Sequence, residues 1–317
     1  MNLDLINSKK FESFALEIFN YQFKNNLVYQ DYCKQLKINS RKIKSIEKIP
    51  FLPISFFKSH KIVSNQKKIK KIFTSSGTGG TESYHYVTDL NLYEKSIRSC
   101  FKEFYGECSS YAFLGITPKP EEKPNSSLIY MINYLINNSI YNESSFINNA
   151  DDLIEKGHYF EMKKIKYIVY GLSYALIDIL EKGNFSLKNS IIIETGGMKG
   201  KRKEISKNEL HSILAKGFKT NKINSEYGMT ELLSQSYCNS NLIFKTPVSK
   251  KILIRDINDP FKISKYGRGP INIIDLANIN SCSFIATDDY GIINSNGFNL
   301  LGRLDESDLR GCNQMLI

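Results

Sequence analysis

Residues 74–81 read Thr74-Ser75-Ser76-Gly77-Thr78-Gly79-Gly80-Thr81, a stretch of glycines and hydroxyl side chains between the runs KKIKKIF (67–73) and SYHYV (83–87). Glycines let backbone N–H groups approach an anion closely, and the hydroxyls add further donors. The stretch lacks the Gly-Lys-[Ser/Thr] ending of a Walker A loop and the spacing of a G-x-G-x-x-G dinucleotide turn. We interpret it as a nucleotide-phosphate loop of another kind, with a plain hairpin turn or linker as the alternative.

Short apolar runs alternate with longer amphipathic segments after this loop. Buried strands are expected over 111–116, 166–170 and 190–194, and helices over 90–105, 126–139, 173–182 and around 210–214. Asp89 and Gly106 are typical residues for the start and the end of the first of these helices. This alternation predicts an α/β fold with a largely parallel sheet that is covered by helices on both faces.

The pattern is different at the two ends of the chain. Residues 3–48 predict two or three helices that pack on the main body, and 50–63 predict an extended segment. From residue 250 onward, KKILIRD (250–256), INIIDL (271–276), SFIATDD (283–289) and GIIN (291–294) predict a smaller antiparallel unit. We therefore expect a helical segment at 1–49, an α/β domain at 50–302 with a β-rich part at 248–302, and a tail at 303–317.

Composition excludes several classes of protein. The 317 residues are 41% hydrophobic and 24% charged, which is ordinary for a globular protein. Six cysteines without a C-x-x-C pair argue against a disulfide framework and against a structural zinc site. The net charge of +11 comes from lysines spread along the chain, without a motif for specific nucleic-acid binding. No signal peptide or transmembrane segment is recognisable, so we expect a cytoplasmic protein.

Three further motifs follow the glycine-rich loop in the sequence. Residues 225–231 (SEYGMTE) offer an aromatic ring for a purine, a hydroxyl for a phosphate and a carboxylate for Mg²⁺. Residues 287–291 (TDDYG) place Asp288 at an expected strand end, where it can accept hydrogen bonds from ribose hydroxyls. Residues 301–308 (LGRLDESD) supply Arg303, which suits phosphate or ribose oxygens. Taken singly, Asp288 fits an ordinary turn residue as well as it fits a ribose ligand. Arg303 taken singly fits a partner in a surface ion pair.

The order of these motifs resembles that of the adenylate-forming superfamily, which contains acyl-CoA synthetases, luciferases and peptide-synthetase adenylation domains. The resemblance covers residues 50–312. Within the superfamily the chain is similar to the acyl-protein synthetase family of the bacterial bioluminescence fatty-acid reductase complex. The segments that carry this similarity are PFLPISFFKSHKIV (50–63), TSSGTGG (74–80), NSSLIYM (125–131), ETGGMKGKRKE (194–204), SEYGMTELLSQ (225–235), NIIDLANINSCSFIATDDYG (272–291) and LGRLDESDLRGCNQM (301–315).

The resemblance implies a role for each matching position. The ATP phosphates would be held by Thr74, Ser75, Ser76, Gly77, Thr78 and Gly79. The adenine pocket would be bordered by Gly196, Gly197, Tyr227 and Gly228. The remaining contacts would be Thr230 to the α-phosphate, Glu231 to Mg²⁺, Asp288 to the ribose and Arg303 to the ribose or a phosphate.

Two departures from the superfamily pattern concern the acyl acceptor. Glu82 and Ser83 stand where a proline and a lysine usually follow the loop, and the chain ends shortly after Arg303. We therefore expect the mobile C-terminal domain, with its catalytic lysine, to be missing. In the acyl-protein synthetase family a cysteine near the C-terminus accepts the acyl group as a thioester, and the matching residue is Cys312, with Arg310 placed to stabilise its thiolate. Without the resemblance, Cys312 would be read as an inert cysteine.

Three functions remain open at this point. The first is an ATP- and Mg²⁺-dependent ligase that activates a fatty or other aliphatic acid as an acyl-adenylate and transfers it to Cys312 or to an acyl-CoA reductase-like partner. The second is a ligase that uses coenzyme A or an acyl carrier protein as the external thiol. The third is a degenerate adenylate-binding protein, which the missing loop lysine favours and the intact Thr230, Glu231, Asp288 and Arg303 disfavour.

Overall fold

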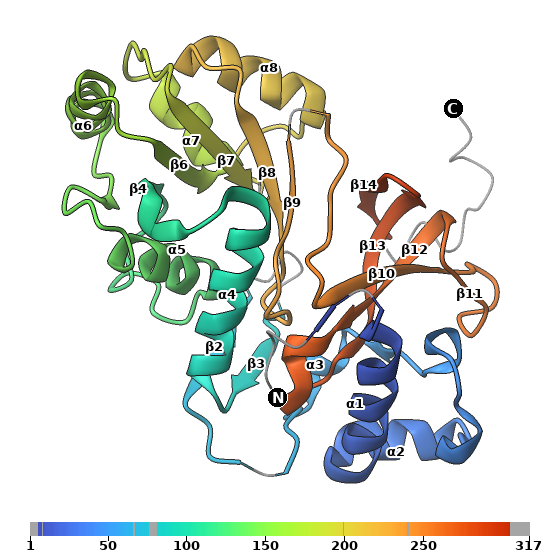
Figure 1. Ribbon diagram of the computed structural model, residues 1–317. Coiled ribbons are helices and arrows are strands. Elements are labelled where there is room, and N and C mark those ends of the chain that lie inside the picture. Colours follow the sequence, from blue (N-terminus) through green and yellow to red (C-terminus); the bar gives the residue numbers. More distant parts are fainter. Residues whose placement is uncertain are drawn as a thin grey trace.

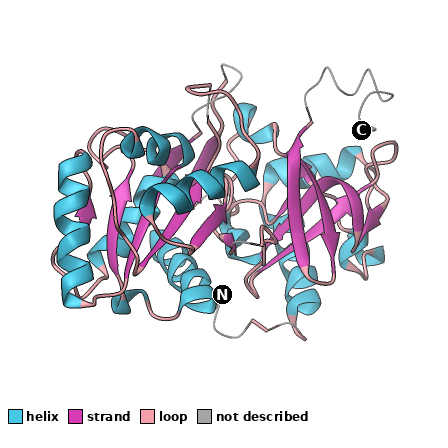
Figure 2. Ribbon diagram, turned by 90° about the horizontal axis from the view of Figure 1, so that it is seen from above, coloured by secondary structure: helices cyan, strands magenta, loops and turns pink. Residues whose placement is uncertain are grey.

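The computed structural model describes residues 6–7, 9–65, 67–75, 81–198, 200–239 and 241–304 (Figure 1). A parallel sheet with its helices lies beside a second, mostly antiparallel sheet, and Figure 2 shows the two sheets next to each other from above. None of the helices in these ranges combines the length and the apolar character that a membrane span needs.

The larger α/β part is built on a six-stranded sheet in the order β5-β4-β6-β7-β8-β9. Its strands are β4 (Ala112–Ile116), β5 (Ser145–Phe146), β6 (Tyr167–Leu172), β7 (Ser190–Thr195), β8 (Ile223–Tyr227) and β9 (Ser236–Cys238). All neighbours are parallel except β8 and β9. Every residue of β4 and β6 is buried, which is why these strands appear as unbroken apolar runs in the sequence. The predicted parallel sheet is confirmed.

Helices cover both faces of this sheet. They are α4 (Leu90–Tyr105), α5 (Ser127–Asn137), α6 (Ala150–Lys163), α7 (Ser173–Leu180) and α8 (Lys207–Phe218). Alternate strand residues face opposite sides: Phe113 joins the core cluster that includes residues of α4 and α5, whereas Leu114 joins the cluster with residues of α6, α7 and α8. The sequence analysis did not predict α6, because it has few apolar residues and its buried side consists of Ala150, Leu153, Gly157 and Phe160.

The predicted ends of α4 are correct. Oδ1 of Asp89 accepts a hydrogen bond from the backbone N–H of Leu92 at 3.1 Å, which satisfies one of the free donors at the helix start. At the other end Gly106 has a φ of +87°, a backbone conformation that residues other than glycine rarely adopt. By contrast, α7 ends at Leu180 rather than at residue 182.

The second sheet contains β1 (Leu52–Pro53), β10 (Lys250–Arg255), β11 (Ile263–Ser264), β12 (Gly267–Asp275), β13 (Phe284–Asn294) and β14 (Gly297–Arg303). Only β1 is parallel to its neighbour, β13. The expected strands SFIATDD and GIIN are one continuous strand, β13, and β14 was not predicted. The segment expected to be extended at 50–63 forms β1 and then the short helix α3 (Phe56–Ser59).

The N-terminal helices α1 (Phe11–Asn25) and α2 (Leu27–Gln35) pack beside this second sheet (Figure 1). The two short 3₁₀ turns η2 (Ser40–Lys42) and η3 (Ile46–Lys48) follow them, and η4 (Cys108–Ser110) precedes β4. The side-chain amide of Gln22 lies 3.0 Å from the carbonyl oxygens of Asn278, Ile279 and Ser281, in and after the 3₁₀ turn η5 (Leu276–Asn280). A buried polar group of this kind fixes how the helix sits on the sheet.

A two-stranded hairpin, β2 (Lys71–Thr74) and β3 (Tyr84–Val87), flanks the glycine-rich loop. One hydrophobic cluster runs from the parallel sheet (Ile168, Ile193) through the second sheet (Ile273, Phe284) to α1 (Phe19). The two sheets therefore share a core, and residues that are distant in sequence meet where the carboxyl ends of β7 and β8 face β13 and the hairpin.

Candidate functional site

The turn after β7 and the end of β8 lie side by side. Thr195 pairs with Glu226 in the parallel register, so the chain leaves the two strands at Gly196 and Tyr227. Gly196 has a φ of +73°, which allows the sharp turn after the strand. Ligands of open α/β sheets bind beyond the carboxyl ends of the strands. Gly196, Gly197, Tyr227 and Gly228, the residues predicted to border an adenine, are at this edge.

A buried carboxyl connects the two strand ends. Glu226 is only 7% exposed, and its Oε2 accepts a hydrogen bond from Oγ1 of Thr195. Burial raises the pKa of Glu226 to about 7, against the opposing effect of the Thr195 hydrogen bond. The carboxyl also folds against Gly228, where a Cβ atom would lie 2.3 Å from Oε1 of Glu226. This close contact gives a physical reason for glycine in the YGMTE motif.

Tyr227 connects the parallel sheet to the second sheet. Its hydroxyl donates a hydrogen bond of 2.6 Å to Oδ2 of Asp289 on β13. The ring lies against Phe244 and Phe298, and the buried Nζ of Lys250 is 4.9 Å from its centroid. The pKa of both Tyr227 and Asp289 is raised, because burial shields the two groups from water.

Asp288 and Arg303 meet on neighbouring strands. The Arg303 guanidinium lies 3.6 Å from Oδ2 of Asp288 and 3.7 Å from Oδ1 of Asp289. We expected Asp288 at the end of a strand, and this was wrong because β13 continues to Asn294. Asp288 instead lies where the pairing of β13 with β12 is interrupted, which turns its side chain out to 46% exposure.

The Thr230-Glu231 segment lies in the turn after β8 and contacts β3 and η5. Oε1 of Glu231 accepts a hydrogen bond of 2.5 Å from Oγ of Ser83, and the carbonyl oxygen of Glu231 accepts one of 2.6 Å from Nδ2 of Asn278. Nδ1 of His85 lies 2.8 Å from the carbonyl oxygen of Thr230. Glu231 is 6% exposed, and burial raises its pKa.

The base of the glycine-rich loop is closed by a pair of serines. The backbone N–H of Ser75 donates to the carbonyl oxygen of Ser83 at 3.1 Å, and the N–H of Ser83 donates to Oγ of Ser75 at 2.9 Å. Thr74 ends β2 and donates its N–H to Asn125. Of the remaining predicted residues, Ser76, Gly77, Thr78, Gly79 and Cys312 lie outside the described ranges.

A second buried cluster lies under the Gly196 turn. Glu194 has no exposed surface, and Nζ of Lys207 lies 2.6 and 2.8 Å from its two oxygens. The hydroxyls of Ser173 and Ser225 also donate to it, the former at 2.6 Å. Burial alone would raise the pKa of Glu194, but nearby His211, the Lys207 charge and these hydrogen bonds lower it to about 2. Glu194 is therefore an ionised carboxylate in the interior.

Four residues that the sequence analysis did not assign to the site take part in it: Ser83, Glu226, Asn278 and Asp289. Glu226 is next to the predicted Tyr227, and Asp289 is next to the predicted Asp288. Which of two neighbouring residues faces the site depends on strand register, which the sequence did not reveal. Asn278 comes from a turn more than forty residues along the chain from Glu231, and no local pattern indicates that contact.

The donor set fits a magnesium ion that arrives with a nucleotide. In the described ranges no three His, Cys, Asp or Glu side chains gather as a metal-binding cluster. Mg²⁺ in nucleotide sites is typically held by one or two carboxylates together with phosphate oxygens and water. Glu231, a buried carboxylate with one oxygen oriented by a hydroxyl, meets that requirement.

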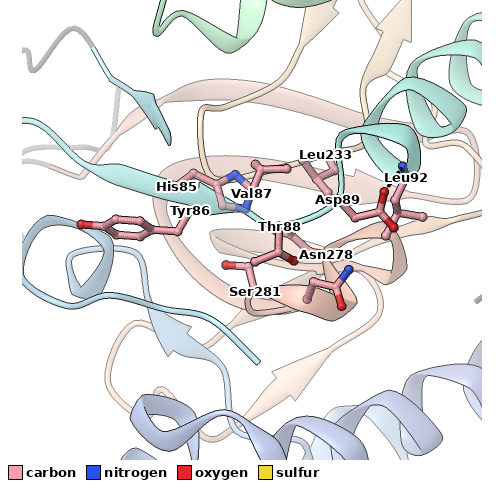
Figure 3. A pocket seen from close by; sticks show the side chains of 10 residues that line it. His85, Tyr86, Val87, Thr88, Asp89, Leu92, Leu233, Asn278 and Ser281 are labelled. Carbon is pink, nitrogen blue, oxygen red and sulfur yellow. Dashed lines mark hydrogen bonds between the residues drawn. The ribbon is translucent and has the colours of Figure 1, made fainter. Parts of the chain in front are cut away.

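The described part of the chain has a small cavity beside this site and a larger groove elsewhere. The cavity between β3 and η5, lined among others by His85, Leu233 and Asn278, measures about 10 Å³ and leaves no room for a ligand (Figure 3). A surface groove of about 770 Å³ between α7 and α8 is lined by Leu180, Met198 and residues that include none of those predicted for the site.

Comparisons with known proteins show what parts of the chain are similar to. Residues 5–106 match the family model described as acyl-protein synthetase, LuxE. Over 70 residues the chain is 37% identical to the long-chain-fatty-acid–luciferin-component ligase of Photorhabdus luminescens. This match covers 22% of the chain and 60% of the relative. The chain thus spans less than two thirds of that curated relative.

Solved structures establish the fold. A 2-hydroxyisobutyryl-CoA ligase in complex with 2-HIB-AMP superposes with a TM-score of 0.68 at 11% identity, covering 94% of this chain and 68% of the ligase. The o-succinylbenzoate CoA synthetase of Bacillus subtilis, in complex with ATP and magnesium, gives 0.52 at 18% identity, covering 73% of this chain and 49% of the synthetase. The family match confirms the inferred resemblance to the acyl-protein synthetases over residues 5–106, and the solved structures show that the chain has the fold of adenylate-forming ligase N-terminal domains.

Proposed function

We propose that this protein is an AMP-forming ligase that uses ATP and Mg²⁺ to activate a carboxylic acid, a fatty or other aliphatic acid, as an acyl-adenylate. The observation that carries the proposal is the meeting of the YGMTE turn, the Gly196 turn and the Asp288–Arg303 pair at the carboxyl edge of the sheet. These are the groups that a nucleoside triphosphate requires, supplied in the order and on the fold of the adenylate-forming ligases.

Each group has a role that follows from its chemistry. Tyr227 and the Gly196-Gly197 turn border the adenine, Asp288 accepts hydrogen bonds from the ribose hydroxyls, and Arg303 contacts ribose or phosphate oxygens. Thr230 donates to the α-phosphate. The loop of Thr74, Ser75, Ser76, Gly77, Thr78 and Gly79 would hold the ATP phosphates through N–H and hydroxyl donors.

Glu231 would hold the metal. Mg²⁺, when bound, neutralises phosphate charge as the acid's carboxylate attacks the α-phosphorus and pyrophosphate leaves. A cation near Glu231 also offsets the burial that raises the pKa of this carboxyl, so the ionised form is favoured in the loaded site. Positioning and charge neutralisation supply most of the catalysis in such reactions, and no side chain needs to become a covalent nucleophile in this first step.

The second step is transfer of the acyl group to a thiol. We propose Cys312 as the acceptor: its thiolate attacks the acyl carbonyl, a thioester forms, and AMP leaves with the electron pair of the broken bond. A protein of the acyl-CoA reductase type would then be the partner that takes the acyl group, and the cytoplasm would be the compartment. The alternative acceptor is the thiol of coenzyme A or of an acyl carrier protein.

The first step is tested by ATP–pyrophosphate exchange. The purified chain is incubated with ATP, Mg²⁺ and labelled pyrophosphate, with each of a series of straight-chain, branched and aromatic acids in turn. We expect exchange that depends on the acid and is strongest for an aliphatic chain, because adenylate formation is reversible and requires the matching acid. An absence of acid-dependent exchange with the whole series would contradict the proposal.

The acceptor is tested with the variant Cys312→Ser. With the best radiolabelled acid and ATP, we expect the wild-type chain to carry a hydroxylamine-labile label on denaturing gels and the variant to carry none, while exchange is unchanged. Cys108→Ser is the matched control, because Cys108 is a buried free cysteine in the turn η4 and belongs to none of the site motifs. A label that persists in Cys312→Ser would exclude Cys312. Exchange without any label on the wild type would point to coenzyme A or a carrier.

A further inference from the structure

Ser83 lies at the junction of the glycine-rich loop and strand β3, where it faces the Thr230-Glu231 turn. Ser83 and His85 are two residues apart, and only 2% and 1% of their surfaces are exposed, whereas Tyr84 between them is 37% exposed. Residues two apart on an extended chain point to the same side. One side of this segment is therefore directed into the protein, toward the turn that carries the proposed metal ligand.

Three residues from two segments fix this turn at separate atoms. His85 holds the Thr230 carbonyl oxygen at 2.8 Å, and because a carbonyl only accepts, Nδ1 of His85 carries the proton. Asn278 holds the Glu231 carbonyl oxygen at 2.6 Å. Ser83 alone of the three contacts the Glu231 carboxylate, donating from Oγ to Oε1 at 2.5 Å. The backbone of the turn is thus held independently of Ser83, whereas the carboxylate is held by the Ser83 hydroxyl together with the backbone N–H of Glu231 itself.

Ser83 is itself held in place. Its backbone N–H and carbonyl oxygen form the two hydrogen bonds with Ser75 that close the loop base. The hydroxyl therefore starts from a fixed backbone, and only one side-chain torsion separates that backbone from Oγ.

From this geometry we propose that Ser83 is a positioning residue: its hydroxyl orients the Glu231 carboxylate for the divalent cation and links the base of the phosphate loop to the metal ligand. The inference rests on the proposed function and deepens it. Partners that hold metal ligands in this way usually contribute 10- to 100-fold to metal affinity. Removal of the hydroxyl should therefore weaken metal binding while leaving the carboxylate and the fold in place.

The test measures metal affinity directly. Binding of Mn²⁺, as a paramagnetic substitute for Mg²⁺, is titrated by electron paramagnetic resonance in the presence of α,β-methylene-ATP. We expect Ser83→Ala to raise the dissociation constant of Mn²⁺ about 10- to 100-fold, and Ser83→Thr, which keeps the hydroxyl, to restore most of the affinity. Ser190→Ala is the control, because it removes a buried hydroxyl that donates to a backbone carbonyl at the opposite end of β7.

The variant Glu231→Gln separates failure of the inference from failure of the proposed function. If Glu231→Gln loses Mn²⁺ and Ser83→Ala binds it as the wild type does, Ser83 has no positioning role and the metal role of Glu231 stands. If Glu231→Gln also binds Mn²⁺ normally, the metal role of Glu231 is overturned as well. Thermal unfolding of all variants is measured alongside, and equal loss of affinity in Ser83→Ala and Ser83→Thr would contradict the inference.

Discussion

Replacement of Glu231 by glutamine is expected to reduce acid-dependent ATP–pyrophosphate exchange by about 10²- to 10³-fold, the range found when one preorganised electrostatic group is removed from an active site. The reason is that glutamine preserves the shape of the side chain and its contact with Ser83 but provides no negative charge for the cation. The loss should be largest at low Mg²⁺ concentration and should shrink as the Mg²⁺ concentration is raised, because mass action refills a weakened site.

This substitution should leave the fold intact. Glu231 is 6% exposed, and burial raises its pKa, so the folded chain without a cation gains little from its charge. A neutral amide can occupy the same place without that cost. We therefore expect the thermal unfolding midpoint of Glu231→Gln to equal or exceed that of the wild type. The control is Glu155→Gln, which changes an exposed glutamate on α6 in the same way. Full exchange activity in Glu231→Gln would contradict the proposed site.

The sequence predicted the parallel sheet well because its signals are local. The unbroken apolar runs of β4 and β6 and the capping residues Asp89 and Gly106 depend on neighbours in the chain. The second sheet was predicted less completely. Nothing local distinguishes one long strand from two short ones at residues 283–294, because β13 keeps its direction by pairing with β12 and β14 on its two sides.

In the candidate site, too, the sequence predicted what depends on local motifs and missed what depends on long-range packing. The order of motifs singled out Thr230, Glu231 and Arg303 as site residues, which stays a prediction, and the structure places Arg303 beside Asp288. The contact of Tyr227 is with Asp289 rather than with its neighbour Asp288, because the side that each residue faces is set by strand pairing. The bond between Ser83 and Glu231 joins residues 148 positions apart, and only the packing of β3 against the turn reveals it.

Substitution of Lys207 by methionine is expected to lower the free energy of unfolding at neutral pH by about 1–3 kcal/mol. This is less than the loss for a fully buried ion pair, because the Lys207 side chain is 37% exposed although Glu194 is fully buried. Glu194 would remain in the interior as a charge without its ammonium partner, although the hydroxyls of Ser173 and Ser225 would still donate to it. Adding Glu194→Gln to Lys207→Met should recover part of the loss, because the double variant no longer buries an unpaired charge. Urea unfolding of the four proteins measures this cycle.

The pH dependence of the same cycle identifies the charge responsible. Because the pKa of Glu194 falls from an ordinary 4.5 to about 2 on folding, the folded chain binds fewer protons than the unfolded chain between these values. The stabilisation, about 3 kcal/mol for a shift of this size, is present above pH 4.5 and is lost as the pH falls toward 2. The difference between wild type and Lys207→Met should therefore narrow at pH 3, and a difference that does not change with pH would show that Lys207 acts through packing alone. Nζ of Lys207 and Oγ of Ser173 also lie 3.4 and 3.0 Å from the carbonyl oxygen of Gly196. If the Gly196 turn borders the nucleotide as proposed, the same variant should raise the KM for ATP, because it removes one of the two side chains that hold this turn.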